Sequence, residues 1–203
     1  MNHPAFFDQV RRIKVRDPLA ELLGSCEGGL IEYGYVDAVR LAGHSCPTVA
    51  GAYLVTLRAL ARLFPTGPAE RGSVRVHLRD GIGEGVTGVI ANVVSMLTGA
   101  AGEGGFKGLA GRFKRRNLLH FDARIPASIR FERTHDGQAV DVDYHPERIP
   151  APTRMRELLG RVVSGTASAS EQHEFGALWQ ERVRRILIDG VDDDTLVVLS
   201  GPH

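Results

Sequence analysis

Cysteines are scarce in this chain, and it has neither a long apolar run nor an excess of charge of one sign. Its two cysteines, Cys26 and Cys46, are too few for a disulfide framework, although a single bridge between them is an alternative. We therefore expect reduced thiols and a cytoplasmic protein. No apolar stretch reaches the roughly 18 residues that a membrane helix needs, and the polar N-terminus lacks a signal-peptide core, so we expect no membrane partner. The 25 basic and 24 acidic residues nearly cancel, which argues against nucleic acid as a partner.

The hydrophobic content, 43% of 203 residues, is enough for one core with an appendage. Apolar periodicity and turn residues predict the order helix, strand, helix, strand, helix, then a run of strands and a helical tail. This order predicts an α+β fold of two layers, with helices packed on a largely antiparallel sheet. Three prolines at 146, 150 and 152 mark a change in composition. We therefore expect a domain over residues 1–148 and, packed on the same core, a helical C-terminal appendage over residues 149–203.

The boundaries of these elements follow from capping residues and from apolar spacing. Pro47 is predicted to be the first residue of a long helix because proline needs no N–H there, and Asp17 with Pro18 predicts the start of a shorter helix. Ser170, with Glu174 nearby, is the expected cap of the last helix. Helices are expected at 6–13, 18–23, 47–64, 86–97, 153–164 and 170–189, and strands at 36–41, 73–80, 117–121, 127–133, 139–144 and 195–199.

The stretch Gly-His-Ser-Cys-Pro-Thr at 43–48 is the most informative local pattern. Cys46 precedes Pro47, so we expect it at or near the cap of the long helix. There the helix dipole and the unpaired backbone N–H groups favour a thiolate, the form that binds metals and attacks electrophiles. His44 lies two residues earlier, and on an extended backbone both side chains would point to the same side. One imidazole and one thiolate would then share a soft metal ion such as zinc.

The plain alternative is that both residues are structural. A lone cysteine is usually a small buried hydrophobe, and a lone histidine is more often a hydrogen-bonded polar residue than a ligand. A His-x-Cys pair also cannot fill a tetrahedral site, so further ligands or water must come from elsewhere. The local pattern by itself therefore leaves the metal site and the structural role both open.

Three features together resemble the FmdE-like family, which is named after one component of formylmethanofuran dehydrogenase and includes stand-alone bacterial relatives. The stretch 43–47 is similar to the family's Gly-His-x-Cys-Pro signature, and an apolar helix with small residues follows it. The alternating strand at 74–78 leads to a helix that ends in Thr98-Gly99. The glycine-rich stretch 102–108 resembles a turn of the family that contains glycine and lysine. The resemblance covers residues 17–145.

This resemblance implies a two-layer α+β fold, a homodimer and a metal site, usually zinc, around His44 and Cys46. It also implies cysteines near the start of the second long helix and just after Thr98-Gly99, where this chain has Val89-Ile90-Ala91 and Ala100-Ala101. Those thiol ligands are absent, and the tail lacks the cysteine-rich zinc ribbon of some relatives. The dehydrogenase after which the family is named is a complex of several different chains, and its redox cofactors lie largely in the other ones. The name therefore does not predict that activity here.

Four more residues are candidates for completing a site. Glu84 lies in the glycine-rich turn before the second long helix, where a carboxylate would face an open site as a general base. Cys26, His77 and His120 are candidate further metal ligands. The plain alternatives are space filling for Cys26, a solvated strand face for His77 and a partly buried histidine for His120.

Two other stretches, one glycine-rich and one basic, raise the question of anion binding. The glycines at 102–105 follow a helix and precede a strand, which is the wrong order for a dinucleotide or Walker loop, so we expect a flexible loop. The basic run at 112–116 would attract an anionic ligand or partner, but such a run is more often the solvated start of a strand.

Two classes of function remain, and the sequence does not decide whether the protein is an enzyme. In the first, His44 and Cys46 hold zinc or another soft transition metal in a metal enzyme or a redox-associated accessory protein. In the second, the protein is a non-catalytic binder or carrier of a larger cofactor such as haem, in an apolar pocket with His44 or Cys46 as axial ligand. The sequence has no Cys-x-x-Cys-His, which excludes covalently attached haem.

Overall fold

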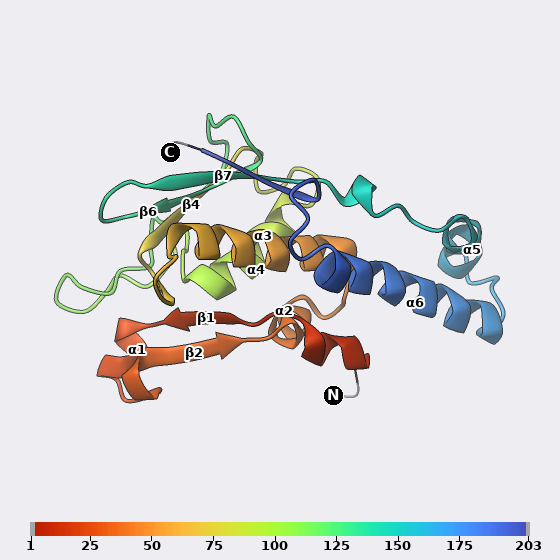
Figure 1. Cartoon of the computed structure of the whole chain (residues 1–203), viewed down its shortest axis with the longest axis horizontal. Helices are drawn as coiled ribbons and strands as arrows, with labels where there is room; N and C mark the ends of the chain where they lie inside the picture. Colours follow the sequence, from red (N-terminus) through yellow and green to blue (C-terminus); the bar gives the residue numbers. More distant parts are fainter. Residues whose placement is uncertain (1–2, 202–203) are drawn as a thin grey trace.

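A long central helix, α3 (Pro47–Leu63), lies between two β-sheets. The computed structural model describes residues 3–201, and Figure 1 shows a larger sheet on one side of α3 and α4 (Thr87–Thr98) and a smaller sheet on the other. Twelve of the 17 residues of α3 are buried. A helix buried on nearly every side is a core helix, so the rest of the chain is arranged around α3.

The larger sheet has five strands in the order β5-β4-β6-β7-β8. Only β4 and β5 are parallel; the other neighbours are antiparallel. Along β4, Val74, Val76 and Leu78 are buried, and Arg75 and His77 lie on the opposite face. The strands are β4 (Val74–Leu78), β5 (Leu119–His120), β6 (Ile129–Arg133), β7 (Ala139–Tyr144) and β8 (Val197–Ser200).

The smaller sheet has β1 (Ile13–Arg16) in its middle, antiparallel to β2 (Leu30–Tyr33) and parallel to β3 (Ala69–Glu70). Tyr53 of α3 fastens the N-terminal segment to the core, because its hydroxyl lies 3.0 Å from the carbonyl oxygens of Arg11 and Tyr33. Burial raises the pKa of Tyr53, so its hydroxyl stays a neutral donor.

The remaining helices are shorter or peripheral. Helix α6 continues into a π-helical turn, η4 (Arg185–Asp189), and three 3₁₀ turns connect other elements. These helices and turns are α1 (Pro18–Leu22), α2 (Tyr35–Ala42), α5 (Thr153–Val163), α6 (Ala169–Arg184), η1 (Ala5–Gln9), η2 (Glu27–Gly29) and η3 (Pro146–Arg148).

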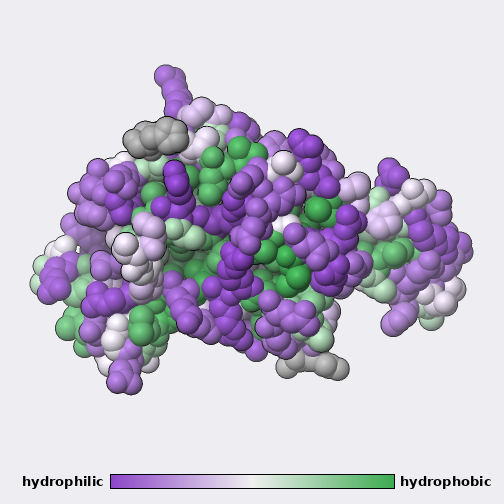
Figure 2. All heavy atoms as spheres, in the orientation of Figure 1, coloured by the Kyte–Doolittle hydropathy of each residue, from purple (hydrophilic) through white to green (hydrophobic). Residues whose placement is uncertain are grey.

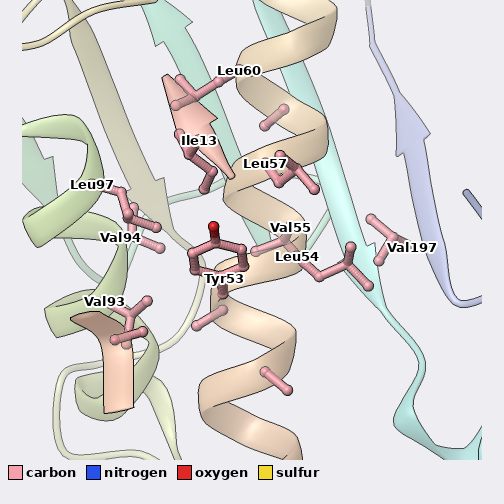
Figure 3. Packing of buried hydrophobic residues seen from close by; sticks show 14 of the residues in the cluster. Ile13, Tyr53, Leu54, Val55, Leu57, Leu60, Val93, Val94, Leu97 and Val197 are labelled. Carbon is pink, nitrogen blue, oxygen red and sulfur yellow. The ribbon is translucent and has the colours of Figure 1, made fainter. Parts of the chain in front are cut away.

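One continuous hydrophobic core joins both sheets and the helices between them. Figure 3 shows Tyr53 on the side of α3 that faces α4, near Val93 and Val94, while Leu54 extends on the other side toward Val197. All five side chains are fully buried. Burying a large apolar side chain contributes roughly 1.5–3 kcal/mol, so this cluster is the main source of stability. The predicted α+β fold is confirmed, and the structure adds the smaller sheet to the expected one.

The strand predicted at 36–41 is wrong, because this segment is helix α2. Tyr35, Ala38 and Val39 are buried, which is the i, i+3, i+4 spacing of a helix face. The N–H of Gly34 donates to the carboxylate of Asp37 at 2.9 Å and helps to cap the helix. The apolar residues of this segment alternate with other residues over a few positions, and this short alternation was mistaken for the two-residue period of a strand.

Two further predictions need correction. The helix expected at 6–13 is only the short turn η1, and Ile13 already begins β1. The cap of α6 is Ser168 and not Ser170: Glu171 donates its N–H to the Ser168 hydroxyl at 3.3 Å, and its carboxylate accepts the Ser168 N–H at 2.8 Å. This reciprocal pair is a capping box with its ordinary spacing.

The C-terminal segment starts as an appendage but returns to the main body. Figure 1 shows α5 and α6 extending away from the sheets, after which β8 pairs with β7. No helix among residues 3–201 has the length and apolarity that crossing a membrane requires. Figure 2 shows a mostly hydrophilic face, with hydrophobic residues near the end that carries α1, where Leu22, Leu23 and Leu30 are exposed.

Candidate functional site

A cleft of about 380 Å³ opens at the N-terminal end of α3. Its walls come from the ends of β4 and β7, the starts of α3, α4 and β6, and the glycine-rich turn before α4. The lining mixes apolar side chains with a few polar groups, which is typical of small-molecule sites. It consists of Pro47, Thr48, Leu78, Asp80, Glu84, Gly85, Val86, Thr87, Ile90, Ser128, Ile129, Tyr144 and Pro146.

The first wall of the cleft is the start of α3, as the sequence predicts. Cys46 is the N-cap residue and Pro47 the first helical residue. The Cys46 side chain is buried, and its sulfur accepts the N–H of Val49 at 3.4 Å. The predicted cap position is therefore confirmed, and one of the unpaired N–H groups at the helix start is satisfied by the cysteine itself.

Tyr144 lines the cleft beside the start of α3 and packs directly on the backbone of that helix. A Cβ atom on Gly51 would lie 2.2 Å from Cε1 of Tyr144, so this contact requires glycine. The Tyr144 hydroxyl donates to the carbonyl of Pro47 at 3.0 Å. Burial raises the pKa of Tyr144, which keeps the hydroxyl neutral at the edge of the cleft.

Two carboxylates give the cleft its charge. Glu84 is exposed, and its Oε2 accepts the N–H of Gly81 at 3.1 Å, which closes the turn. Asp80 is partly buried, and its Oδ1 lies 3.3 Å from Nε of Arg79. The sequence pointed to Glu84 as facing an open site, and Glu84 does line this cleft.

His44 lies outside the cleft. Its side chain is exposed, and Nδ1 lies 3.0 Å from the carbonyl oxygen of Ala42. The next residue, Ser45, is fastened to α6, because its carbonyl accepts Nε1–H of Trp179 at 2.9 Å and its hydroxyl donates to Gln180 at 3.0 Å. His44 and Cys46 thus lie on either side of the anchored Ser45. The His44 side chain is exposed, and the Cys46 side chain is buried.

Further metal ligands are not gathered around His44 and Cys46 within residues 3–201. In the part of the chain that the structure describes, no group of three or more His, Cys, Asp or Glu side chains is arranged to hold a metal ion. Zinc at His44 and Cys46 would need ligands from a second molecule or from water. Zinc binding at this pair therefore stays a prediction, with its further ligands still to be found.

Cys26 and Cys46 lie next to different elements of the fold. It precedes η2, in the connection between α1 and β2, whereas Cys46 caps α3 next to α2. Figure 1 shows α1 and α2 at opposite ends of β2. Both cysteines are free thiols.

His77 and His120 form a pair on the outer face of the larger sheet. They are register partners on β4 and β5, and their rings stack with centroids 5.1 Å apart. Nε2 of His77 is buried 3.4 Å from Oε2 of Glu132, and Nε2 of His120 lies 3.1 Å from the carbonyl oxygen of Asn117. A cavity of about 420 Å³ adjoins the pair. Burial lowers the pKa of His77, and Glu132 opposes this effect.

No protein-family model matches the chain, and a search of curated proteins finds no match. The resemblance to the FmdE-like family therefore stays a prediction, as does the homodimer.

Sequence reasoning did not single out Tyr144, Asp80 or Ser128 as cleft residues. Asp80 directly precedes the glycine-rich turn that carries Glu84, which was a usable signal. For Tyr144 the sequence carried no comparable signal, because its partner Gly51 is remote in the chain and only the folded sheet brings them together.

Proposed function

We propose that this protein binds a small molecule with an apolar body and a positively charged or hydrogen-bond-donating group in the cleft at the N-terminal end of α3. Leu78, Ile90 and Ile129 supply apolar wall for the body of the ligand. Asp80 and Glu84 supply acceptors for its polar group. This places the protein in the class of binding modules, and the proposal is limited to binding.

One observation carries this proposal, the charge of the lining. Among residues 3–201, the cleft is lined by two carboxylates and by no lysine or arginine. Arg79 pairs with Asp80 from outside the lining, so the unpaired charge is that of Glu84. Charge of one sign in a cleft with low-dielectric walls raises the local concentration of ligands of opposite charge. An amine would therefore be favoured over a carboxylic acid with the same apolar body.

The resemblance to the FmdE-like family supports the same location. Its Gly-His-x-Cys-Pro signature, here at 43–47, leads into the helix whose first turn lines the cleft. Membership of that family, and the homodimer that it implies, belong to this proposal.

Zinc binding is the second candidate, and it is favoured by the buried Cys46 sulfur at the start of α3. The site would combine His44 and Cys46 with ligands from outside the chain. Haem is less well supported, because neither His44 nor Cys46 lines the cleft as an axial ligand would.

Native mass spectrometry of protein purified without chelators tests both candidates. Benzylamine and benzoate, which share an apolar ring and differ in charge, are the probes for the cleft. We expect a benzylamine adduct that weakens about tenfold in Glu84→Gln, because a hydrogen bond to a charged group contributes about 1.5–3 kcal/mol. Glu103→Gln removes an exposed carboxylate outside the cleft and is the matched control.

The outcomes separate the two candidates. Equal binding of benzoate and benzylamine, or equal affinity of Glu84→Gln and Glu103→Gln, would contradict the cleft proposal. Zinc that copurifies with the wild type and is lost in Cys46→Ala would support the metal site. Equal metal content in both proteins would rule that site out.

A further inference from the structure

The basic run at 112–116 lies over a second cavity, of about 590 Å³, at the start of β4. The sequence left open an anionic ligand or partner and the solvated start of a strand, and in the structure the run forms one wall of this cavity. In the described part of the chain, Glu70 is the single carboxylate among the lining residues. Six cationic side chains line the cavity: Arg16, Arg71, Arg75, Arg112, Lys114 and Arg115.

A buried carboxylate holds two of these cations in place. Asp17 is 4% exposed, and its two oxygens bind Arg71 at 3.0 Å and Arg115 at 2.6 Å. Burial by itself would raise the pKa of Asp17, but the hydrogen bond from Arg71 and the charge of Arg115 together outweigh it and lower the pKa. The carboxylate therefore stays ionised and fixes both guanidinium groups at the cavity.

Two other cations at the cavity are paired near the surface. Arg16 contacts Glu21 and Glu70, and Arg75 contacts Glu132. The guanidinium groups of Arg16 and Arg75 remain partly accessible beside the cavity. Their carboxylate partners position them, and both groups add to the positive potential of the cavity.

Arg112 and Lys114 are different, because neither forms an ion pair with any carboxylate in residues 3–201. The guanidinium of Arg112 lies over the ring of Phe113, 4.7 Å from its centroid, and Lys114 is exposed. The cavity and its immediate partners thus hold two more cations than carboxylates. The excess charge lies on the two residues that no acidic partner neutralises.

The backbone of this loop is held in a costly conformation. Ala110 and Phe113 have positive φ angles of 46° and 62°, which non-glycine residues rarely adopt. Leu109 and Arg112 exchange two backbone hydrogen bonds of 2.9 and 2.8 Å, which close the turn between them. Strained backbone of this kind is concentrated at ligand sites, because the surrounding structure must maintain it. Figure 1 shows the loop, in green, at the same end of the molecule as α1.

We propose that this cavity binds a small molecule that bears one or more phosphate groups, with Arg112 and Lys114 as the contacts that neutralise it. Guanidinium and ammonium groups are the side chains that bind phosphate in proteins. The volume of the cavity lies in the range of small-molecule sites. The proposal is independent of the cleft at α3, whose lining has the opposite charge.

Isothermal titration calorimetry on the full chain tests this proposal with five probes: inorganic phosphate, pyrophosphate, adenosine triphosphate, adenosine and a single-stranded RNA. We expect binding of pyrophosphate and the triphosphate, weaker binding of phosphate and none of adenosine. Tighter binding of the triphosphate than of pyrophosphate would identify a nucleotide as the source of the phosphate, and equal binding would identify the phosphate groups alone. Affinity is expected to fall as salt is raised from about 50 to about 200 mM, since charge carries the binding.

Substitutions at the two unpaired cations give the decisive comparison. We expect the double variant Arg112→Ala/Lys114→Ala to bind pyrophosphate more than tenfold more weakly than the wild type. The double variant Lys107→Ala/Arg156→Ala removes the same charge from exposed positions outside the cavity and is the control. Urea unfolding of both variants checks that they are folded.

Four results would overturn the proposal. They are the absence of binding to any phosphate probe, equal affinities of the two double variants, binding of adenosine as tight as that of the triphosphate, and tighter binding of a single-stranded RNA than of the triphosphate. The last result would instead assign the surface to nucleic acid.

Discussion

The two cavities of opposite charge lie at the two ends of one strand. The basic cavity is lined by Arg75, near the start of β4, and the acidic cleft by Leu78 and Asp80, at its end. Because side chains alternate along a strand, Arg75 and Leu78 point to opposite faces of the sheet. Strand β4 therefore contributes residues to both sites and keeps the positive charges of one apart from the negative charges of the other.

The two sites use carboxylates in different ways. Behind the lining of the basic cavity, Asp17 is buried and bound to two arginines, so it is part of the framework. In the acidic cleft, Glu84 is exposed and accepts only the N–H of Gly81, so it is available to a ligand. Burial and pairing thus distinguish a carboxylate that holds the fold from one that recognises a molecule.

The largest expected effect comes from neutralising the carboxylate of the basic cavity. Asp17→Asn keeps a good helix cap but removes the charge that Arg71 and Arg115 share. We expect a loss of about 3–5 kcal/mol in the free energy of unfolding, because a buried arginine is left without its partner. Urea unfolding at neutral pH measures this loss.

The comparison with the acidic cleft sharpens this prediction. Glu84→Gln is expected to change the free energy of unfolding by less than about 0.5 kcal/mol, as is usual for exposed positions. Similar losses in Asp17→Asn and Glu84→Gln would show that the two carboxylates do not differ in role. A smaller loss is also expected from Asp192→Asn, since the Arg11–Asp192 pair is exposed.

The next effect concerns the wall of the acidic cleft. Gly51→Ala places a methyl group against the ring of Tyr144, and we expect a loss of about 1–3 kcal/mol from this overpacking. Gly176→Ala in α6 meets no atom within 4 Å and is the matched control, with an expected gain of up to about 1 kcal/mol. Gly51→Ala should also weaken the benzylamine adduct and leave pyrophosphate binding unchanged. Equal stability of the two variants would contradict the close contact.

Strong local features allowed much of the fold to be predicted. The Pro47 start and regular apolar spacing predicted α3, and the alternation of Val74, Val76 and Leu78 predicted β4. Helix α2 was missed because Val36, Ala38 and Arg40-Leu41 gave a short alternation that outweighed its helical spacing. Strands β1, β2 and β3 have only two to four residues each, too short for a period to be evident.

The sites depend on contacts that local sequence does not encode. The cap position of Cys46 and the place of Glu84 in an open turn follow from neighbouring residues, and both were predicted. The basic cavity depends on Asp17 and Arg115, which are 98 residues apart, and no spacing rule connects them. Only the folded chain, which brings the start of α1 and two distant loops together, determines which charges are paired.

The smallest expected effect concerns His77, on β4 between the two cavities. Burial lowers its pKa, Glu132 raises it in part, and His120 and Arg75 lower it further, so the native pKa lies below the ordinary 6.5. The unfolded chain therefore binds more protons, and stability falls as the pH drops below 6.5 through the native pKa. One such group changes the slope by at most about 1.4 kcal/mol per pH unit.

Urea unfolding between about pH 7.5 and 5.0 tests this prediction, with His77→Gln compared with His135→Gln in an exposed turn. The wild type and His135→Gln should lose stability toward the acid end of this range, and His77→Gln should lose less. The pH range separates His77 from Asp17. The native pKa of Asp17 is lowered, so its stabilising effect is retained above its ordinary pKa of 3.8 and is lost only as the pH falls below that value. If all three proteins show the same slope across the range, His77 does not contribute to the acid sensitivity, and the prediction is wrong.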